Sequence, residues 1–199
     1  VVVNDASQRG NGAKLYHVQW ATDNGRPVLR FNEKYSAGFV MMLSPELLPV
    51  KEGYPRDLTL DAWIKPAAGK SGDVMGFFYS PRLYLNPTGA DKLTLNLSMN
   101  YGGKWETLTS PAFPAGAWTH VAGTIAGGKA RLYVNGKMVQ EKALADGKLT
   151  FTHYNAAVSI GTYTWFGNTS FTGDMAELRW WARAATDQEI AATAAKGRP

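Results

Sequence analysis

The chain has 199 residues, of which 45% are hydrophobic and 19% are charged, and this composition is sufficient for one well-buried core, so we expect a single domain over residues 1–199. The absence of cysteine excludes a disulfide framework and a thiolate metal site. The net charge of +5 comes from 21 basic residues that are scattered without a basic arm, so we expect no nucleic-acid partner.

The sequence contains no initiator Met, no signal peptide and no long apolar run. We therefore expect no membrane partner, and the sequence has the character of a module excised from a larger multidomain protein. The modest basicity would suit an anionic partner such as an acidic polysaccharide.

Glycine and aromatic residues are abundant, with 21 Gly, 9 Tyr and 7 Trp among short alternating runs, and this pattern favours an all-β sandwich. Residues 28–43 predict two strands around a turn. Residues 58–66 predict a strand that carries Trp63 and is stopped by Pro66.

Several strands are predicted between residues 73 and 110, separated by Pro, Gly or Asp. The run at 93–99 alternates between apolar and polar side chains, so its two faces differ. The polar face is either exposed to solvent or lines a concave groove. The apolar face consists of Leu93, Leu95, Leu97 and Met99, and the polar face of Thr94, Asn96 and Ser98.

Residues 117–139 predict a pair of strands, joined at Gly127-Gly128 and ended by Asn135-Gly136. These dipeptides supply the positive φ angles that two-residue hairpin turns require. A last strand is predicted over residues 175–181, and a capping box at residues 186–189 predicts the start of a short C-terminal helix.

Residues 118–124, WTHVAGT, followed by residues 131–136, RLYVNG, resemble the laminin G-like, concanavalin A-like jelly-roll family of lectins and glucanase-related modules. Residues 58–66 resemble the core tryptophan strand of that family, and residues 171–190 resemble its last strand and terminal helical turn. The resemblance extends over residues 4–190 and implies a two-sheet antiparallel jelly-roll sandwich.

The same resemblance places Trp63, Trp118 and Trp181 on core positions of the family, so their indoles are expected to be buried. His120 is also expected to be a packing residue. We do not count these side chains as candidate site residues.

Glycoside hydrolases of this fold carry paired carboxylates at adjacent same-face positions of one strand. The sequence contains no Glu-x-Asp-x-Glu run: Asp174 and Glu177 fall on opposite strand faces, and Asp57 and Asp61 share a face but are too far apart. A Gly-x-Ser-x-Gly nucleophile elbow is also absent. We therefore expect no catalytic residues, and a glycoside hydrolase is the weakest of the alternatives.

Many members of the family hold a structural calcium ion near the first turn and the final strand, and Asp5 matches the acidic position of the opening motif. Where the final strand of the family carries an aspartate, this chain has Ala176. The alternative interpretation of Asp5 is an Asx turn onto Ser7.

The loop at residues 162–170 is the first candidate binding site, because it holds three large aromatic side chains between Gly161 and Gly167. Aromatic faces stack on the C–H faces of sugar rings, and an amide side chain can bond to their hydroxyl groups. The alternative is a loop folded over the end of the core. The candidate residues are Tyr163, Trp165, Phe166 and Asn168.

A second candidate cluster combines aromatic stacking surface with positive charge on nearby strands. The arginine in it could bind a carboxylate or sulfate through two parallel hydrogen bonds. The cluster consists of Tyr79, Arg82, Tyr84, Tyr101, Lys104 and Trp105.

These patterns lead to the hypothesis of a noncatalytic carbohydrate-binding module, secreted or at the cell surface and attached to a polysaccharide-degrading enzyme. Its expected partner is a polysaccharide or another glycan, neutral or anionic. The alternative is an interaction or spacer domain that binds no sugar.

Overall fold

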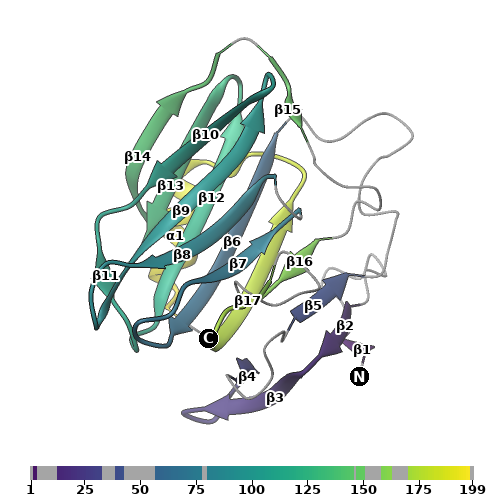
Figure 1. Cartoon of the computed structure of the whole chain (residues 1–199), viewed down its shortest axis with the longest axis vertical. Coiled ribbons are helices and arrows are strands. Elements are labelled where there is room, and N and C mark those ends of the chain that lie inside the picture. Colours follow the sequence, from purple (N-terminus) through teal and green to yellow (C-terminus); the bar gives the residue numbers. More distant parts are fainter. Residues whose placement is uncertain are drawn as a thin grey trace.

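The computed structural model describes residues 2–3, 13–32, 39–42, 57–77, 80–145, 147–150, 158–162 and 170–197. The described strands form two antiparallel sheets that are stacked on one another (Figure 1). The helix at the C-terminal end follows the last strand. The all-β, two-sheet sandwich expected from the sequence is thereby confirmed.

Sheet A contains ten of the described strands. The strands that form its continuous order are β1 (Val2–Val3), β2 (Ala13–Tyr16), β5 (Phe39–Met42), β16 (Ser159–Ile160), β7 (Gly72–Gly76), β8 (Arg82–Pro87), β9 (Lys92–Tyr101) and β10 (Lys104–Thr109). Two short strands also pair with β9, namely β11 (Phe113–Pro114) and β15 (Leu149–Thr150).

Sheet B contains seven of the described strands. Their order is β14 (Lys137–Ala143), β13 (Lys129–Val134), β12 (Thr119–Ala126), β6 (Leu58–Pro66), β17 (Gly173–Trp181), β4 (Arg26–Phe31) and β3 (Val18–Asp23). Strand β6 therefore pairs with β12 on one side and with β17, the last strand in the sequence, on the other.

The predicted hairpin over residues 117–139 is present as β12, β13 and the start of β14. The backbone has positive φ at Gly127 and Gly128, with 53° and 71°, and at Asn135 and Gly136, with 49° and 76°. These angles are the conformation for which Gly and Asn are suited, so the turn chemistry of the sequence is confirmed.

The hydrophobic core lies between the two sheets, and strand β9 shows how alternation builds it. The four predicted apolar side chains of β9 are at most 1% exposed, while its polar side chains point to the opposite face. Burial of each such side chain contributes about 1.5–3 kcal/mol relative to exposure. The facing side chains of sheet B include Leu58, Leu60, Ile64, Val121, Leu132 and Met175.

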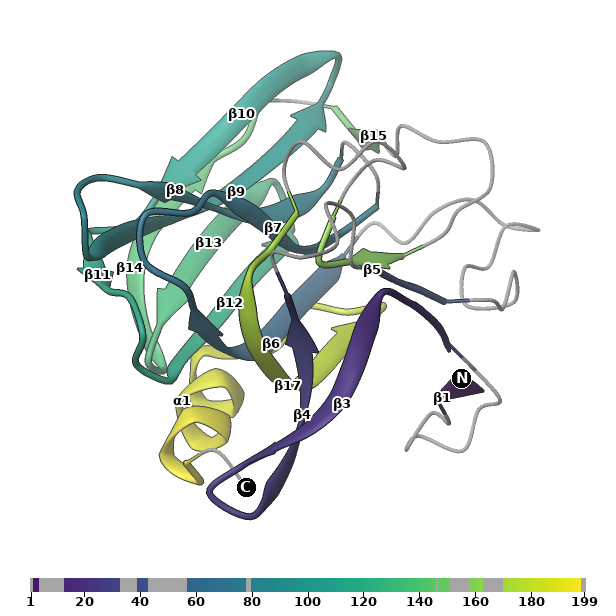
Figure 2. The same ribbon diagram turned by 60° about the horizontal axis from the view of Figure 1, so that its bottom comes forward.

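Helix α1 (Asp187–Ala195) covers part of the outer face of sheet B (Figure 2). The predicted capping box is present, because the Thr186 hydroxyl accepts from the Glu189 backbone N–H and the Glu189 carboxylate accepts from the Thr186 backbone N–H. Ile190 is fully buried and packs with Ala122 and Tyr133 of the sheet. This contact holds the apolar side of helix α1 against sheet B, on the face that points away from sheet A.

The tryptophans that were expected to be buried lie on the outer face of sheet B. Side chains alternate along a strand, and these tryptophans are on the same side of the sheet as His120, whereas Val121 points into the core. Trp63 is buried against His120, with ring centroids 5.3 Å apart. Trp118 and Trp181 are only half-buried, which corrects the expectation of full burial. The indole N–H of Trp118 donates to Asp23 at 2.7 Å.

Candidate functional site

Of the residues predicted to form a binding site, one group lies outside the described residues of the chain. This group contains the whole aromatic loop and one tyrosine of the second cluster. It comprises Tyr163, Trp165, Phe166, Asn168 and Tyr79, and the candidate calcium ligand Asp5 also lies outside the described residues.

The strand register places three residues of the second cluster on one surface, which we call the outer face of sheet A. Arg82 and Tyr84 of β8 are opposite Ser98 and Asn96 of β9, and Trp105 of β10 is opposite Asn100. The intervening positions of β9 point into the core. Because side chains alternate along a strand, Arg82, Tyr84 and Trp105 must point away from the core.

Tyr101 and Lys104 have the opposite strand parity and do not join this surface. They face each other at the β9–β10 hairpin, and Tyr101 packs against the core from its edge. The structure therefore brings together Arg82, Tyr84 and Trp105 on one face, and separates them from Tyr101 and Lys104. The sequence pattern groups all of these residues because it does not specify the register of the β9–β10 hairpin, which decides the face on which each side chain lies.

The side chain of Arg82 is held in place from two directions. Its guanidinium carbon lies 4.4 Å from the centre of the Tyr84 ring, a cation–π distance. Its Nη1 donates to Asp73 Oδ1 at 3.0 Å. Gly76 is paired with Arg82 across the strands, and a Cβ atom there would lie 2.5 Å from the Arg82 Cβ. A glycine at position 76 is therefore necessary for this arrangement.

The floor of the outer face of sheet A is polar and bonded within the sheet. The Thr109 hydroxyl donates to Asn96 Oδ1 at 2.8 Å, and the Thr107 hydroxyl donates to Ser98 Oγ at 3.2 Å. Asn96 and Ser98 are buried as a result, whereas the two threonines remain exposed. Trp105 is 55% exposed, the highest value among the large hydrophobic side chains that the structure describes.

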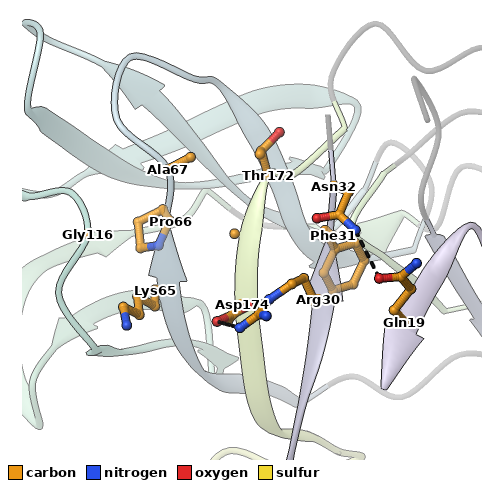
Figure 3. A pocket seen from close by; sticks show the side chains of 11 residues that line it. Gln19, Arg30, Phe31, Asn32, Lys65, Pro66, Ala67, Gly116, Thr172 and Asp174 are labelled. Carbon is orange, nitrogen blue, oxygen red and sulfur yellow. Dashed lines mark hydrogen bonds and ion pairs between the residues drawn. The ribbon is translucent and has the colours of Figure 1, made fainter. Parts of the chain in front are cut away.

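A concave region, which we call the rim pocket, lies where β4 and β6 end and β17 begins (Figure 3). It has a volume of about 660 Å³. Arg30 and Asp174 form a bidentate ion pair in it, with distances of 2.7 Å and 2.9 Å. This hydrogen bonding raises the pKa of Arg30. No sequence motif marked the pocket, because its residues come from strands that are far apart in the chain.

A buried polar cluster lies on the outer face of sheet B. The His120 Nε2 atom is 3.2 Å from Asp61 Oδ1, and Arg179 Nη1 donates to the same oxygen at 3.0 Å. Arg179 also bonds to Glu177, whose φ of 50° marks the bulge in β17. Asp61 and His120 have no exposed surface, so a ligand in solvent cannot reach them.

Two further observations on the described residues concern metal binding and membrane spans. Among these residues, no group of three or more His, Asp or Glu side chains is arranged to hold a metal ion. No helix in the described part of the chain is long and apolar enough to cross a membrane.

The sequence profile of the concanavalin A-like lectin/glucanases superfamily matches residues 44–191. The chain therefore belongs to this superfamily, and the jelly-roll sandwich expected from the sequence is its fold. None of the curated proteins with which the chain was compared is significantly similar to it in sequence.

Solved structures with the same fold include domain 4 of AbnA, a GH43 extracellular arabinanase from Geobacillus stearothermophilus, in complex with arabinotriose. The identity is 18% over 94% of this chain and 91% of that domain, with a TM-score of 0.67. A heptameric SAP-like pentraxin from Limulus polyphemus is 20% identical over 70% of each chain, with a TM-score of 0.56.

The binding domain of Paraclostridial Mosquitocidal Protein 1 is 14% identical over 96% of this chain and 48% of that chain, with a TM-score of 0.72. The chain thus spans about half the length of that binding domain. At these identities the likeness concerns the fold.

Proposed function

We propose that this chain is a noncatalytic carbohydrate-binding module whose site is the outer face of sheet A. The observation that carries the proposal is Trp105, which is 55% exposed beside a polar floor on the same face as Tyr84 and Arg82. An exposed indole is costly in water and stacks well on the C–H face of a sugar ring. The Thr107 and Thr109 hydroxyls lie on the same strand face and supply partners for sugar hydroxyls.

Charge on this surface favours a neutral glycan over an anionic one. The guanidinium of Arg82 is already paired with Asp73, so the pair contributes no net charge to the face. A ligand that binds mainly through stacking and hydroxyl bonds should be insensitive to salt, because screening acts on unpaired charges. We therefore expect little change in affinity as the ionic strength rises.

The same face supports binding without hydrolysis. Glycoside hydrolysis requires two carboxyl groups within about 5–9.5 Å of each other around the bond that is cleaved. Among the described residues of β7 to β10, Asp73 is the one carboxylate on this face, and it is buried under Arg82. A sugar on this surface would therefore be held and not cleaved.

A similar structure supports our inference about the larger protein to which the module belongs. The arabinanase domain that it resembles belongs to an extracellular enzyme and was solved with a bound oligosaccharide. We infer that the present chain likewise belongs to a larger secreted protein that acts on polysaccharides, and that it serves to keep that protein on its substrate.

A glycan array followed by calorimetry tests the proposal, with arabinotriose as the first oligosaccharide. Trp105→Ala should weaken binding at least tenfold, about 1.4 kcal/mol, because it removes the stacking surface. The matched control is Trp20→Ala on β3, since Trp20 is 52% exposed but belongs to sheet B. Both variants should keep the wild-type melting temperature to within a few degrees.

Two outcomes would contradict the proposal. In one, no glycan on the array binds the wild-type chain, which would favour an interaction or spacer domain. In the other, every glycan that binds the wild type binds Trp105→Ala equally well, so that none of them uses the outer face of sheet A.

A further inference from the structure

The rim pocket is not part of the proposed binding face and has no role in it. It is lined by residues of β3, β4, β6 and β17 and by the turn at Gly116, so it belongs to sheet B and not to the outer face of sheet A. Its volume of about 660 Å³ lies within the range of sites that bind small molecules. Its walls include the ends of β4, β6 and β17, each of which is paired on both sides in the described sheet, and the edge strand β3.

The pocket floor is held rigidly because two strands approach closely there. Gly173 has φ of 131°, and a Cβ atom at this position would lie 2.2 Å from the carbonyl oxygen of Lys65. Backbone hydrogen bonds from Ala67 to Thr172 and from Gly116 to Pro66 connect the surrounding segments. A site that is formed before the ligand arrives loses less conformational entropy on binding.

The polar groups of the pocket present both donors and acceptors. Asn32 Nδ2 donates to Gln19 Oε1 at 3.2 Å, which uses one donor of the first amide and one acceptor of the second (Figure 3). Each amide has further donor or acceptor capacity, as has the carboxylate of Asp174. Adjacent donors and acceptors of this kind match the vicinal hydroxyl groups of a sugar, each of which both donates and accepts.

The charges of the pocket are compensated within the protein. Arg30 is paired with Asp174, and Lys65 is paired with Asp23 at 3.2 Å. A site for phosphate or a carboxylate needs cations that are free to pair with the ligand. The compensated charges therefore favour a neutral ligand, and Pro66 and Ala67 offer it an apolar wall.

We propose that the rim pocket binds a single residue of a neutral sugar, as a second site independent of the outer face of sheet A. The chain would then hold two parts of one polysaccharide, or two neighbouring chains. Two weak sites on one rigid body give a higher overall affinity than either site alone, provided that the polymer can reach both.

The test is an NMR titration of the ¹⁵N-labelled chain with D-glucose, D-galactose, D-mannose, D-xylose and L-arabinose. At least one sugar should shift the amide signals of Ala67 and Gly116 with a millimolar dissociation constant, about −4 kcal/mol. Gln19→Ala and Asn32→Ala should each weaken this binding at least fivefold. Ala67→Trp should abolish it by filling the pocket.

Controls separate the pocket from the fold and from the first site. Gln188→Ala removes an exposed glutamine on α1 and should bind like the wild type, as should Trp105→Ala. Thermal melting of each variant checks that it is folded. Loss of sugar binding in the pocket variants alone supports the inference.

The inference is overturned if none of these sugars shifts the Ala67 and Gly116 signals at concentrations up to about 0.1 M, well above a millimolar dissociation constant. It is also overturned if a sugar binds but responds only to Trp105→Ala. In that second case the outer face of sheet A remains a glycan site, so the two proposals fail separately.

Discussion

At the scale of single residues, Asp61 is a fully buried carboxylate that contacts two other side chains, His120 and Arg179. It has no exposed surface, and both His120 and Arg179 contact its Oδ1 atom. Removal of Asp61 leaves the fully buried His120 without this hydrogen-bond partner in an interior that solvates polar groups poorly, whereas Arg179 keeps its ion pair with Glu177. Removing one partner therefore lowers the free energy of unfolding by more than formation of the interaction contributes to it.

We expect Asp61→Ala to lower the free energy of unfolding by about 1–3 kcal/mol, the usual cost of leaving a buried polar group such as His120 without its hydrogen-bond partner. Urea denaturation followed by tryptophan fluorescence measures this. Asp57→Ala provides the control, because Asp57 is exposed just before the same strand and should change stability by no more than about 0.5 kcal/mol. Equal midpoints for the two variants would show that the buried cluster does not contribute as described.

The sequence predicted part of this cluster and missed the rest. His120 was expected to pack, and it does pack against Trp63. Glu177 and Arg179 could not be placed from strand alternation, because the bulge between Ala176 and Arg179 changes the parity of β17. A bulge of this kind depends on the neighbouring strand, so it has no signature within a single stretch of sequence.

At the scale of secondary structure, helix α1 depends on its first turn. Glu189 accepts two hydrogen bonds from Arg183, at 2.7 Å and 2.8 Å, and one from the Thr186 backbone. These bonds, with those from Arg183 as the main cause, lower the pKa of Glu189 from 4.5 to about 2. The ionised carboxylate is therefore the form that the folded helix stabilises.

This shift has a definite consequence for the pH dependence of stability. A carboxylate with a lowered pKa stabilises the fold above the unfolded pKa of 4.5, and its contribution is lost as the pH falls from 4.5 toward about 2. We expect the melting temperature of the wild type to fall more steeply over this range than that of Glu189→Gln. Parallel curves for the two proteins would contradict this account.

The hydroxyl half of the capping box can be tested at neutral pH. Thr186→Ala should cost about 1 kcal/mol, because the Glu189 backbone N–H loses its acceptor. Circular dichroism during thermal unfolding measures the loss. Thr186→Ser keeps the hydroxyl and should restore most of the stability.

Local patterns were sufficient to predict many of the elements, although not β2 and β3, and did not indicate which elements are neighbours. Leu93 to Met99 showed strict alternation, and the turns at Gly127-Gly128 and Asn135-Gly136 carried their own chemistry. The rim pocket, in contrast, needs Arg30 and Asp174 to meet across paired strands. Pairings between distant segments are set by the global topology, and a single sequence contains no direct record of them.

At the scale of the whole molecule, the two outer faces of the sandwich are different. The outer face of sheet B carries helix α1 and the buried cluster, and the outer face of sheet A carries the exposed Trp105. Under the proposed function, a polysaccharide would lie on the outer face of sheet A, beside Trp105. The second site that we propose, in the rim pocket, would lie at an end of sheet B and would share no lining residue with that face.

The position of β17 in the interior of sheet B also determines when the sheet can be completed during synthesis. In the described sheet, β17 lies between β6 and β4, so it is the link between the β3–β4 hairpin and the other strands. That hairpin is synthesised before β17, so β4 cannot pair with β17 until this last strand has also been synthesised.

We expect amide exchange during refolding to protect β3, β4 and β17 together. A chain that ends at residue 172 should leave Leu29 and Phe31 unprotected, whereas protection there would mean that the hairpin folds without its neighbour.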